Sequence, residues 1–597
     1  MTDKDPSAKR KGLGGSWDGL RSVRVALRGH RRLLLAGVVV GFLAGLAEAA
    51  TVGIIALAAG SLTDGAHRIH IAVVGLGVTT GFTTLVDVAF AAAAVRLLLQ
   101  LPAATLPARL ATDVQAGIRD ELFDAFSATS WSEQSRDVEG ALQELMTNQA
   151  MVAANAASGF AGLINTMISF VIMIGAAFLL DPSAAAAVLA IVVAMAGVMR
   201  PMNRLVLRRS HALSQTQLDL ASGIGQAARL AQEVQSFGVE DGQRRRVHEL
   251  IGTTRRLSYR IQVLARIVPS VYQTVIYLLV LGALATLGSA HASHVATLGA
   301  VVLLLVRAGN YGQGVQSSYQ GLLAIAPFAD RVYAAIRRYN ETAAPHGELS
   351  LRGLRTIEAR NVSYSYDPRS TVLTDVSFTV DAGETVGIVG PSGAGKSTLI
   401  QILLGLRSPE TGSYLVNGVS AERFRRRDWH EHFAFVPQEP RLLHATVAEN
   451  IRFFREISEA DVEAAARLAL IHDEVLGWPD GYATIVGPRA DAVSGGQQQR
   501  ICIARALVGH PAVLVLDEPT SALDPHSESL IQESLTSLKD QLTLFIVAHR
   551  MSTLEICTRI MVVLDGRLEA FGTPASLRAS NPYYQRALAV ATRGAGI

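Results

Sequence analysis

The stretch that decides the fold of the second half of the chain is Gly390-Pro391-Ser392-Gly393-Ala394-Gly395-Lys396-Ser397-Thr398. It matches the pattern G-x-x-x-x-G-K-[ST], in which glycines let backbone N–H groups surround phosphate oxygens at a helix N-terminus. In such a loop Lys396 reaches the β- and γ-phosphates of a nucleotide and Ser397 ligates Mg²⁺. Lys396 is also the only lysine between Lys11 and Lys539 in a chain with 49 arginines. Because an ammonium is a compact point charge and a guanidinium a planar fork, this exception indicates a phosphate site.

Composition separates the chain into two halves. Its 597 residues and 63.5 kDa predict two or more domains, and its mean hydropathy of +0.29 is concentrated before about residue 330. The net charge of +3 gives no indication of a nucleic-acid partner, and the two cysteines, Cys502 and Cys557, argue against a disulfide framework. We expect a basic N-terminal segment, a membrane domain, a linker and a soluble domain at residues 1–32, 33–339, 340–355 and 356–597.

Six apolar windows are long enough, at about 20 residues each, to cross about 30 Å of hydrocarbon. They lie near residues 33–62, 71–98, 156–180, 183–207, 267–288 and 295–318. The long connection 200–266 contains twelve arginines, whereas the short connections 63–70 and 289–294 contain one between them. Positive charge stays on the cytoplasmic side, so both termini are expected in the cytoplasm. The excess of arginine over lysine is typical of GC-rich bacterial genomes, so the membrane is expected to be a bacterial inner membrane.

The two long inside connections, 101–150 and 200–266, have a helix-compatible composition, so the membrane helices are expected to continue into the cytoplasm. From Thr356 onward, short β-branched runs alternate with helical stretches. These runs lie at 376–380, 385–389, 512–516 and 543–547. The predicted fold class is therefore an α-helical membrane domain of six spans with long cytoplasmic extensions, fused to an α/β P-loop NTPase domain.

Two further motifs follow the phosphate loop. The apolar run 513–516 delivers Asp517 and Glu518, and neighbouring side chains at the tip of a strand point apart. Asp517 is thus expected to hold Mg²⁺ while Glu518 faces the attacking water as general base. Further upstream, Ser494-Gly495-Gly496-Gln497 precedes a helix over 498–508, and its amides form a helix N-terminus suited to an anion.

With these motifs in this order, the chain resembles an ATP-binding cassette (ABC) transporter of the exporter-type half-transporter kind over essentially its whole length. The resemblance implies that Tyr366 stacks on adenine and that Gln438, in Val436-Pro437-Gln438, contacts Mg²⁺ and senses the membrane helices. It implies that Asp524, in Ser521-Ala522-Leu523-Asp524, belongs to the loop that couples two ATP sites. It also implies that His549 contacts the γ-phosphate, so ATP and Mg²⁺ are the expected cofactors.

The resemblance further implies a dimer, because in this family the signature of one subunit closes on the phosphate loop of the other. Ser494 and Gly496 would then complete a partner's site, and the presence of Glu518, His549 and the signature favours a homodimer over a heterodimer. One departure is Gly487-Pro488-Arg489-Ala490, where exporters often carry a glutamate. This leaves open how that segment contacts the membrane helices.

Charged residues inside membrane spans are costly and are therefore candidates for the substrate pathway. Three stand out among the charged residues of the predicted spans: Glu48, Asp87 and Arg307. A structural ion pair of Arg307 with Glu48 or Asp87 is the alternative. Polar residues that follow Arg307 are expected to line a water-filled cavity.

The predicted function is an ATP-driven membrane transporter that exports a small or amphipathic substrate by alternating access. Import on the same architecture, as in siderophore-type carriers, is the alternative, and an ATP-gated channel or a non-transport ABC ATPase is a third reading. Neither the substrate nor the direction follows from the sequence.

Overall fold

The computed structural model divides the chain into two compact units. We call Met1–Thr129 with Glu133–Ala343 the helical unit, and Ser130–Ser132 with Ala344–Ile597 the sheet unit. The residues that the structure describes are 27–64, 69–73, 76–138, 140–180, 182–287, 295–343, 347–367, 369–488, 493–520, 523–548 and 550–594.

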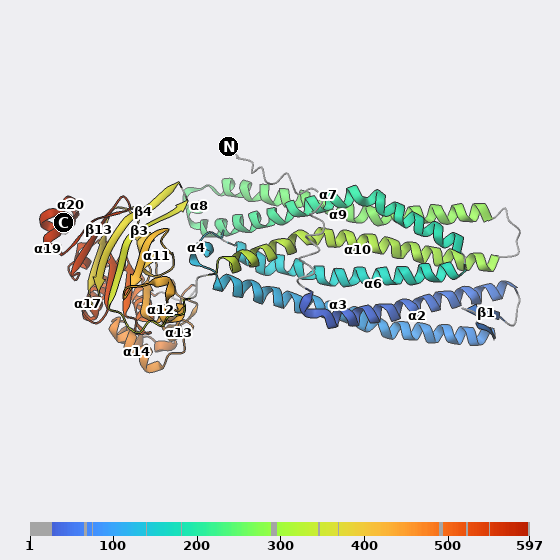
Figure 1. Cartoon of the computed structure of the whole chain (residues 1–597), viewed down its shortest axis with the longest axis horizontal. Helices are drawn as coiled ribbons and strands as arrows, with labels where there is room; N and C mark the ends of the chain where they lie inside the picture. Colours follow the sequence, from blue (N-terminus) through green and yellow to red (C-terminus); the bar gives the residue numbers. More distant parts are fainter. Residues whose placement is uncertain are drawn as a thin grey trace. The chain divides into compact units, whose positions relative to one another are not determined.

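The helical unit is built from long helices that run side by side (Figure 1). They are α2 (Arg31–Asp64), α3 (Phe82–Ala128), α6 (Ala150–Leu180), α7 (Pro182–Arg229), α9 (Glu240–Leu287) and α10 (Val295–Glu341). Among the described residues, five helical stretches are long and apolar enough to cross a membrane. Helix α10 runs through the sixth predicted window, 295–318, part of which lies outside the residues whose side chains are described.

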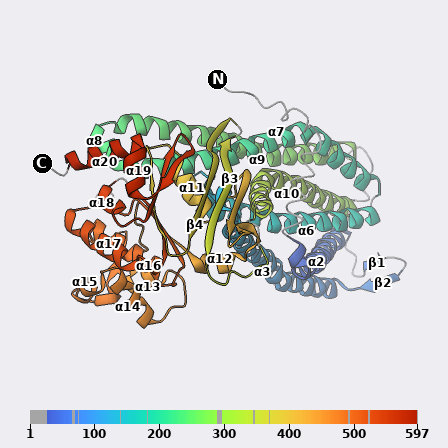
Figure 2. The ribbon, with the colours of Figure 1, turned by 60° about the vertical axis from the view of Figure 1, so that its left-hand side comes forward.

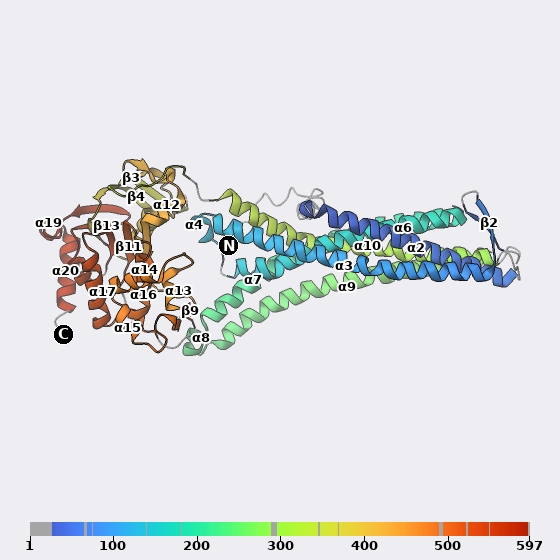
Figure 3. The ribbon, with the colours of Figure 1, turned by 90° about the horizontal axis from the view of Figure 1, so that it is seen from below.

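The helices continue well beyond the apolar windows, as the composition of the two long connections predicts. After α3 come the short helices α4 (Trp131–Gln134) and α5 (Ala141–Glu144) and a π-helical turn, Leu145–Gln149. Helix α8 (Ala231–Phe237) joins α7 to α9 at one end of the unit (Figure 3). A short 3₁₀ turn, Arg28–His30, precedes α2.

One predicted boundary in the helical unit is wrong. The window 71–98 begins in an antiparallel hairpin of β1 (Ile69–Val73) and β2 (Leu76–Thr80), and α3 starts only at Phe82. The hydrophobic residues of β1 follow the two-residue period of a strand, because β-branched residues alternate with other residues there. Average hydropathy does not distinguish such alternation from a helix.

Packing within the helical unit follows the helical period. Helix α3 buries one residue in every four along its later turns, Leu110, Val114, Ile118 and Leu122, which places them on one face. This face packs against α6 and α10, where Tyr339 is fully buried. The rotation of these three helices about their axes is thereby defined.

The sheet unit contains a six-stranded sheet in the order β14-β13-β5-β12-β11-β8, and only the β13–β14 pair is antiparallel. Its strands β5 and β12 are fully buried runs of apolar and small residues, the pattern of strands covered on both faces. The prediction of a mainly parallel α/β domain is confirmed here. The bounds are β5 (Thr385–Val389), β8 (Phe433–Val436), β11 (Val513–Asp517), β12 (Thr543–Val547), β13 (Arg559–Leu564) and β14 (Arg567–Gly572).

A second, antiparallel sheet has the order β4-β3-β6-β7, and its strands β3 and β4 lie on the other side of the unit from α13, α14 and α15 (Figure 2). Its strands are β3 (Thr356–Asp367), β4 (Ser370–Asp381), β6 (Thr411–Val416) and β7 (Val419–Ser420). The remaining strands and helices are β9 (Ala445–Thr446), β10 (Ile485–Val486), α11 (Lys396–Leu403), α12 (Arg426–His432), α13 (Val447–Arg452), α14 (Glu459–Leu468), α15 (His472–Leu476), α16 (Gly495–Leu507), α17 (Pro525–Leu538), α18 (Met551–Leu554), α19 (Pro574–Ser580) and α20 (Pro582–Gly594), with 3₁₀ turns at Ala421–Arg423 and Gly481–Ala483.

The parallel strands position the candidate site. Because β5, β12, β11 and β8 are neighbours and point the same way, their carboxyl ends meet at one edge of the sheet. Ligands of open α/β sheets bind at this edge. The loop 390–395, Gln438 and Asp517 all follow or end these strands.

Candidate functional site

The phosphate loop connects β5 to α11 and needs glycine at several positions. Gly393 and Gly395 have φ values of +81° and +96°, which lie in the left-handed region that favours glycine. A Cβ atom at Gly390 would lie 2.1 Å from the carbonyl oxygen of Val563. The glycines at this loop therefore permit both the turn and the close approach of β13.

Lys396 begins α11 and its side chain returns into the loop. Its Nζ atom donates to the carbonyl oxygens of Gly390 (2.7 Å) and Pro391 (2.9 Å). Burial lowers the pKa of the Lys396 ammonium, and the nearby carboxylates of Glu518 and Asp517 partly oppose this shift. The ammonium is thus held inside the loop, where a phosphate would be its natural counter-charge.

Asp517 ends β11, and Glu518 follows it with a left-handed φ of +45°. The Glu518 N–H donates to the carbonyl oxygen of Val547 at the end of β12, which fixes this unusual backbone. Gln438 Nε2, after β8, donates to Glu518 Oε2 at 2.9 Å. The structure thus joins two predicted site residues that lie 80 positions apart.

A site for Mg²⁺ requires oxygen ligands at this edge. The hydroxyl of Ser397 at the start of α11, the carboxylate of Asp517 and the side-chain carbonyl of Gln438 are the donors that the sequence predicts, and all three are of the right type. A glycine-rich loop before the helix α11 and an ammonium held by the loop carbonyls fit a triphosphate. The residues present therefore fit magnesium-bound ATP.

The signature Ser494-Gly495-Gly496-Gln497 caps α16. Gln497 N–H donates to Ser494 Oγ (3.2 Å) and Ser494 N–H donates to Gln497 Oε1 (2.9 Å), which together form a capping box. A Cβ atom at Gly496 would lie 2.2 Å from Ser527 Oγ, so α17 requires a glycine there. The predicted helix at 498–508 in fact begins at Gly495.

The sequence reasoning missed the residues that support the signature. Glu474 Oε2 accepts from Gln497 Nε2 at 2.9 Å, and Glu474 Oε1 pairs with Arg500 at 2.6 Å. Arg500 is 2% exposed and also donates to the carbonyl oxygen of Leu470. The sequence signal for this network was Arg500, a charged residue on an otherwise apolar face of α16, which needs a buried partner.

Two of the predicted site residues, His549 and Asp524, lie in or next to gaps between the described residues. His549 lies outside the described residues, as do residues 521 and 522 of the predicted coupling loop and residues 489–492 before the signature. Asp524 is described and caps α17, where its Oδ1 atom accepts from the N–H groups of His526 and Ser527. Hydrogen bonds from Ser527 lower the pKa of the Asp524 carboxyl.

Tyr366, the predicted adenine contact, lies at the end of β3 with its side chain 45% exposed. Its hydroxyl lies 3.1 Å from Thr398 Oγ1 and 3.4 Å from Gln401 Oε1, both on α11. Arg407, which the sequence reasoning missed, places its guanidinium 4.6 Å from the centre of the Tyr366 ring. The aromatic ring is thus connected to the helix that begins with Lys396.

In the helical unit the structure brings together Glu48 and Arg307 but leaves Asp87 apart. Glu48 is 5% exposed and pairs with Arg96 (3.1 Å) and Arg307 (3.5 Å), and Tyr311 donates to Glu48 Oε2 at 2.5 Å. The ion pair that was the alternative reading for Arg307 is therefore present. Arg96 was missed, although it lies within the window 71–98.

Asp87, by contrast, is exposed on α3, and the described part of the chain places no ion-pair partner beside it. A cavity of about 360 Å³ lies between α7 and α10. Its polar lining includes Arg200, Arg204 and Asn203 from α7 and Gln316 and Tyr319 from α10. Gln316 Nε2 donates to Asn203 Oδ1 at 3.0 Å, so part of the predicted polar run on α10 does line a cavity.

Comparison with known proteins agrees with this geometry. The family model described as "ABC transporter" matches residues 373–521, and the model described as "ABC transporter transmembrane region" matches residues 34–309. A transmembrane helical region and a phosphate-loop ATPase domain in one chain define a half-transporter. The chain belongs to the ABC transporter family and is a multi-pass membrane protein of the exporter-type half-transporter kind.

Two relatives and one solved structure illustrate the similarity. ATP-binding cassette sub-family B member 5 of Mus musculus is 44% identical over 237 residues, which are 39% of this chain and 19% of that protein. ATP-binding cassette sub-family B member 6 of Homo sapiens is 40% identical over 229 residues, 38% of this chain and 27% of that protein. The matched regions span less than a third of these curated relatives.

The solved structure is titled "Structure of a bacterial Atm1-family ABC exporter with ATP bound". It superposes with a TM-score of 0.78 at 23% identity and covers 94% of this chain and 98% of that chain. At this identity the likeness shows the fold. The predicted fold class is therefore confirmed, and the roles of individual site residues stay predictions.

Proposed function

We propose that the protein is an ATP-driven transporter that exports a small or amphipathic substrate across a bacterial inner membrane by alternating access. The observation that carries this proposal is the Gln438–Glu518 hydrogen bond of 2.9 Å at the edge of the sheet where the Lys396 loop also lies. A carboxylate, an amide and a phosphate loop on neighbouring parallel strands are what phosphoryl transfer to water needs.

Each residue of the site has a defined part in this proposal. Lys396 and the loop amides bind the β- and γ-phosphates, and Ser397, Asp517 and Gln438 hold Mg²⁺, which neutralises charge on the phosphates. Glu518 accepts the proton of the attacking water, and Gln438 orients the Glu518 carboxylate through its hydrogen bond. Tyr366 stacks on adenine and His549 contacts the γ-phosphate, as the family resemblance implies.

The working unit that we propose is a dimer. Ser494, Gly495, Gly496 and Gln497 form the N-terminus of α16, whose N–H groups suit a phosphate. In one chain they belong to a different element from the Lys396 loop, and in a dimer they would close on the partner's loop. Asp524, at the start of α17, would lie beside this junction. A homodimer is the simpler arrangement because one chain carries Glu518 and the signature together.

The proposed substrate pathway runs through the helical unit past the Glu48 cluster. We define the Glu48 cluster as Glu48, Arg96, Arg307 and Tyr311. It carries two guanidinium groups for one carboxylate, and the cavity between α7 and α10 adds Arg200 and Arg204. This excess of positive charge favours cargo that carries an anionic or hydrogen-bond-accepting group. Asp87, exposed on α3, stays a weaker candidate for the pathway.

Reconstitution tests the function directly. Purified protein in liposomes is given MgATP on one side only, and the movement of labelled amphipathic anions and of neutral analogues is followed. We expect movement away from the ATP side, lost when MgATP is replaced by ATP with a chelator. Movement toward the ATP side would establish import instead, and ion conductance that persists without turnover would establish a gated channel. ATP hydrolysis without any movement of cargo would reject transport.

A further inference from the structure

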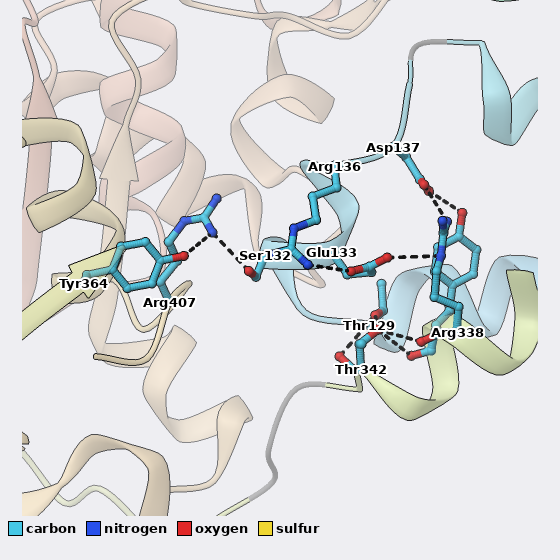
Figure 4. Close-up of polar contacts among 10 residues, drawn as sticks. Thr129, Ser132, Glu133, Arg136, Asp137, Arg338, Thr342, Tyr364 and Arg407 are labelled. Carbon is cyan, nitrogen blue, oxygen red and sulfur yellow. Dashed lines mark hydrogen bonds and ion pairs between the residues drawn. The ribbon is translucent and has the colours of Figure 1, made fainter. Parts of the chain in front are cut away.

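Arg407 lies between the predicted adenine site and the short segment Ser130–Ser132, which groups with the sheet unit. Its side chain is 8% exposed and makes directed contacts with several groups at once (Figure 4). Nη1 donates to Tyr364 OH at 2.7 Å and to Ser132 Oγ at 3.0 Å, and Nε donates to Gln401 Oε1 at 2.5 Å. Its guanidinium also covers the Tyr366 ring.

One side of this arrangement faces the nucleotide site. Tyr366 OH lies 3.1 Å from Thr398 Oγ1, two positions after Lys396 on α11, and Gln401 is on the same helix. Arg407 therefore touches both the aromatic ring that would carry the base and the helix that would carry the phosphates. A base that stacks on Tyr366 changes the electron density and position of a ring on which a guanidinium rests.

The other side leads into the helical unit through the chain itself. Residues Ser130–Ser132 group with the sheet unit, whereas Thr129 and Glu133 on either side belong to the helical unit. Thr129 Oγ1 lies 2.7 Å from Thr342 Oγ1, and Glu133 Oε1 lies 3.1 Å from Arg338 Nε. Both flanks of the segment are thus fastened to the end of α10, the helix that also carries Arg307 and Tyr311 of the Glu48 cluster.

Additional polar contacts connect this end of α10 to residues that follow the segment. Asp137 accepts from Arg338 Nη2 at 2.5 Å and also from the hydroxyl of Tyr339, and Arg136 pairs with Glu133 (Figure 4). Short polar contacts thus connect both flanks of Ser130–Ser132 to the end of α10. The Ser132 side chain is short, so the hydrogen bond from Arg407 to Ser132 Oγ links the guanidinium closely to the backbone of the segment.

We propose that Arg407 is a positioning residue that reports base occupancy at Tyr366 to Ser132, and through Thr129 and Glu133 to α10. This inference rests on the proposed function, because it assumes that adenine stacks on Tyr366. An ammonium has no planar fork, so a lysine at position 407 cannot bond Gln401, Tyr364 and Ser132 together while stacking on Tyr366. The site thereby distinguishes a nucleoside triphosphate from a bare triphosphate, although both fill the phosphate loop.

Trp131, next to Ser132 and 40% exposed, is a native probe of the segment. Full-length protein in liposomes is mixed with MgATP or with magnesium tripolyphosphate, and the Trp131 share of the emission is obtained by subtracting the W131F protein. We expect MgATP to change this emission and tripolyphosphate to leave it unchanged at concentrations that displace ATP.

Three variants test the connection. Arg407→Met removes every bond of the guanidinium, and we expect the response of Trp131 to saturating MgATP to fall about tenfold. Arg407→Lys keeps the charge and should behave like Arg407→Met, whereas Ser132→Ala removes one hydrogen bond and should lower the response about threefold. Arg559→Met is the matched control, because Arg559 also stacks on an aromatic ring of the sheet unit, 3.6 Å from the centre of Phe571, without touching the segment.

The rate of MgATP hydrolysis and the amount of bound ATP are both measured in the same vesicles. If wild-type protein neither binds nor hydrolyses ATP, the proposed function fails. If it hydrolyses ATP but Trp131 does not respond, responds equally to tripolyphosphate, or responds normally in Arg407→Lys and Ser132→Ala, the role of Arg407 is overturned. Ser132→Ala decides the question even where the Arg407 variants unfold, since it leaves the buried guanidinium in place.

Discussion

The phosphate loop and the Glu48 cluster both hold a charged group away from water, but they find their partners at very different distances along the chain. Lys396 bonds to carbonyl oxygens only six and five positions away. Glu48 is bonded by Tyr311, 263 positions away, and pairs with Arg96 on another helix. All residues of a site such as the phosphate loop lie in one stretch of sequence. A site such as the Glu48 cluster forms only when the helices pack together.

The largest effect that we expect tests the chemistry of the sheet unit. Glu518→Gln keeps the shape of the side chain but removes the base, so ATP hydrolysis should fall by about 10² to 10⁴. ATP should still bind, because Lys396 and the loop are unchanged. The measurement is steady-state phosphate release together with the amount of ATP retained by the washed protein.

Glu533→Gln, at an exposed carboxylate of α17, is the control for a lost negative charge in the same unit and should hydrolyse ATP normally. Phosphate release at the wild-type rate from Glu518→Gln would show that Glu518 is not the base. Loss of ATP binding in that variant would instead assign the Glu518 side chain a structural part through its hydrogen bond from Gln438.

How far the sequence predicts each region follows from this difference in separation. The loop at 390–398, the strand at 385–389 and the signature were found because a few neighbouring residues define each of them. Arg407 and Glu474 could not be found in this way, since their meaning depends on partners such as Ser132 and Arg500 that only the fold brings close. Arg96 was missed for the same reason, because a single arginine in an apolar window does not show which helix it will face.

A smaller effect is expected when the distant cluster is broken. Glu48→Ala leaves the guanidinium groups of Arg96 and Arg307 without their shared carboxylate. Removal of one partner from a buried ion pair costs about 3 to 5 kcal/mol, and because these arginines are 33% and 44% exposed we expect about 2 kcal/mol. The measurement is the melting temperature of the purified protein in detergent, which should fall.

Asp87→Ala provides the comparison within the same unit, because Asp87 is an exposed carboxylate in the same predicted membrane region. Its melting temperature should stay close to that of the wild type. Equal melting temperatures for Glu48→Ala and the wild type would mean that the cluster does not stabilise the packed helices. The Glu48 cluster would then differ from the phosphate loop in the sequence separation of its partners, but its contacts would not contribute to the stability of the protein.

The smallest effect separates a local motif that serves only the fold from one that also serves the proposed site. Ser494 and Thr446 both form capping boxes, at the starts of α16 and α13. Loss of an N-cap hydroxyl costs about 1 kcal/mol, so Ser494→Ala and Thr446→Ala should lower the melting temperature by similar amounts. Only Ser494→Ala should also reduce ATP hydrolysis, because the Ser494 cap orders the N–H groups that would meet the partner's phosphates. If both variants hydrolyse ATP equally well, Ser494 serves only to cap α16 and has no part in the ATP site.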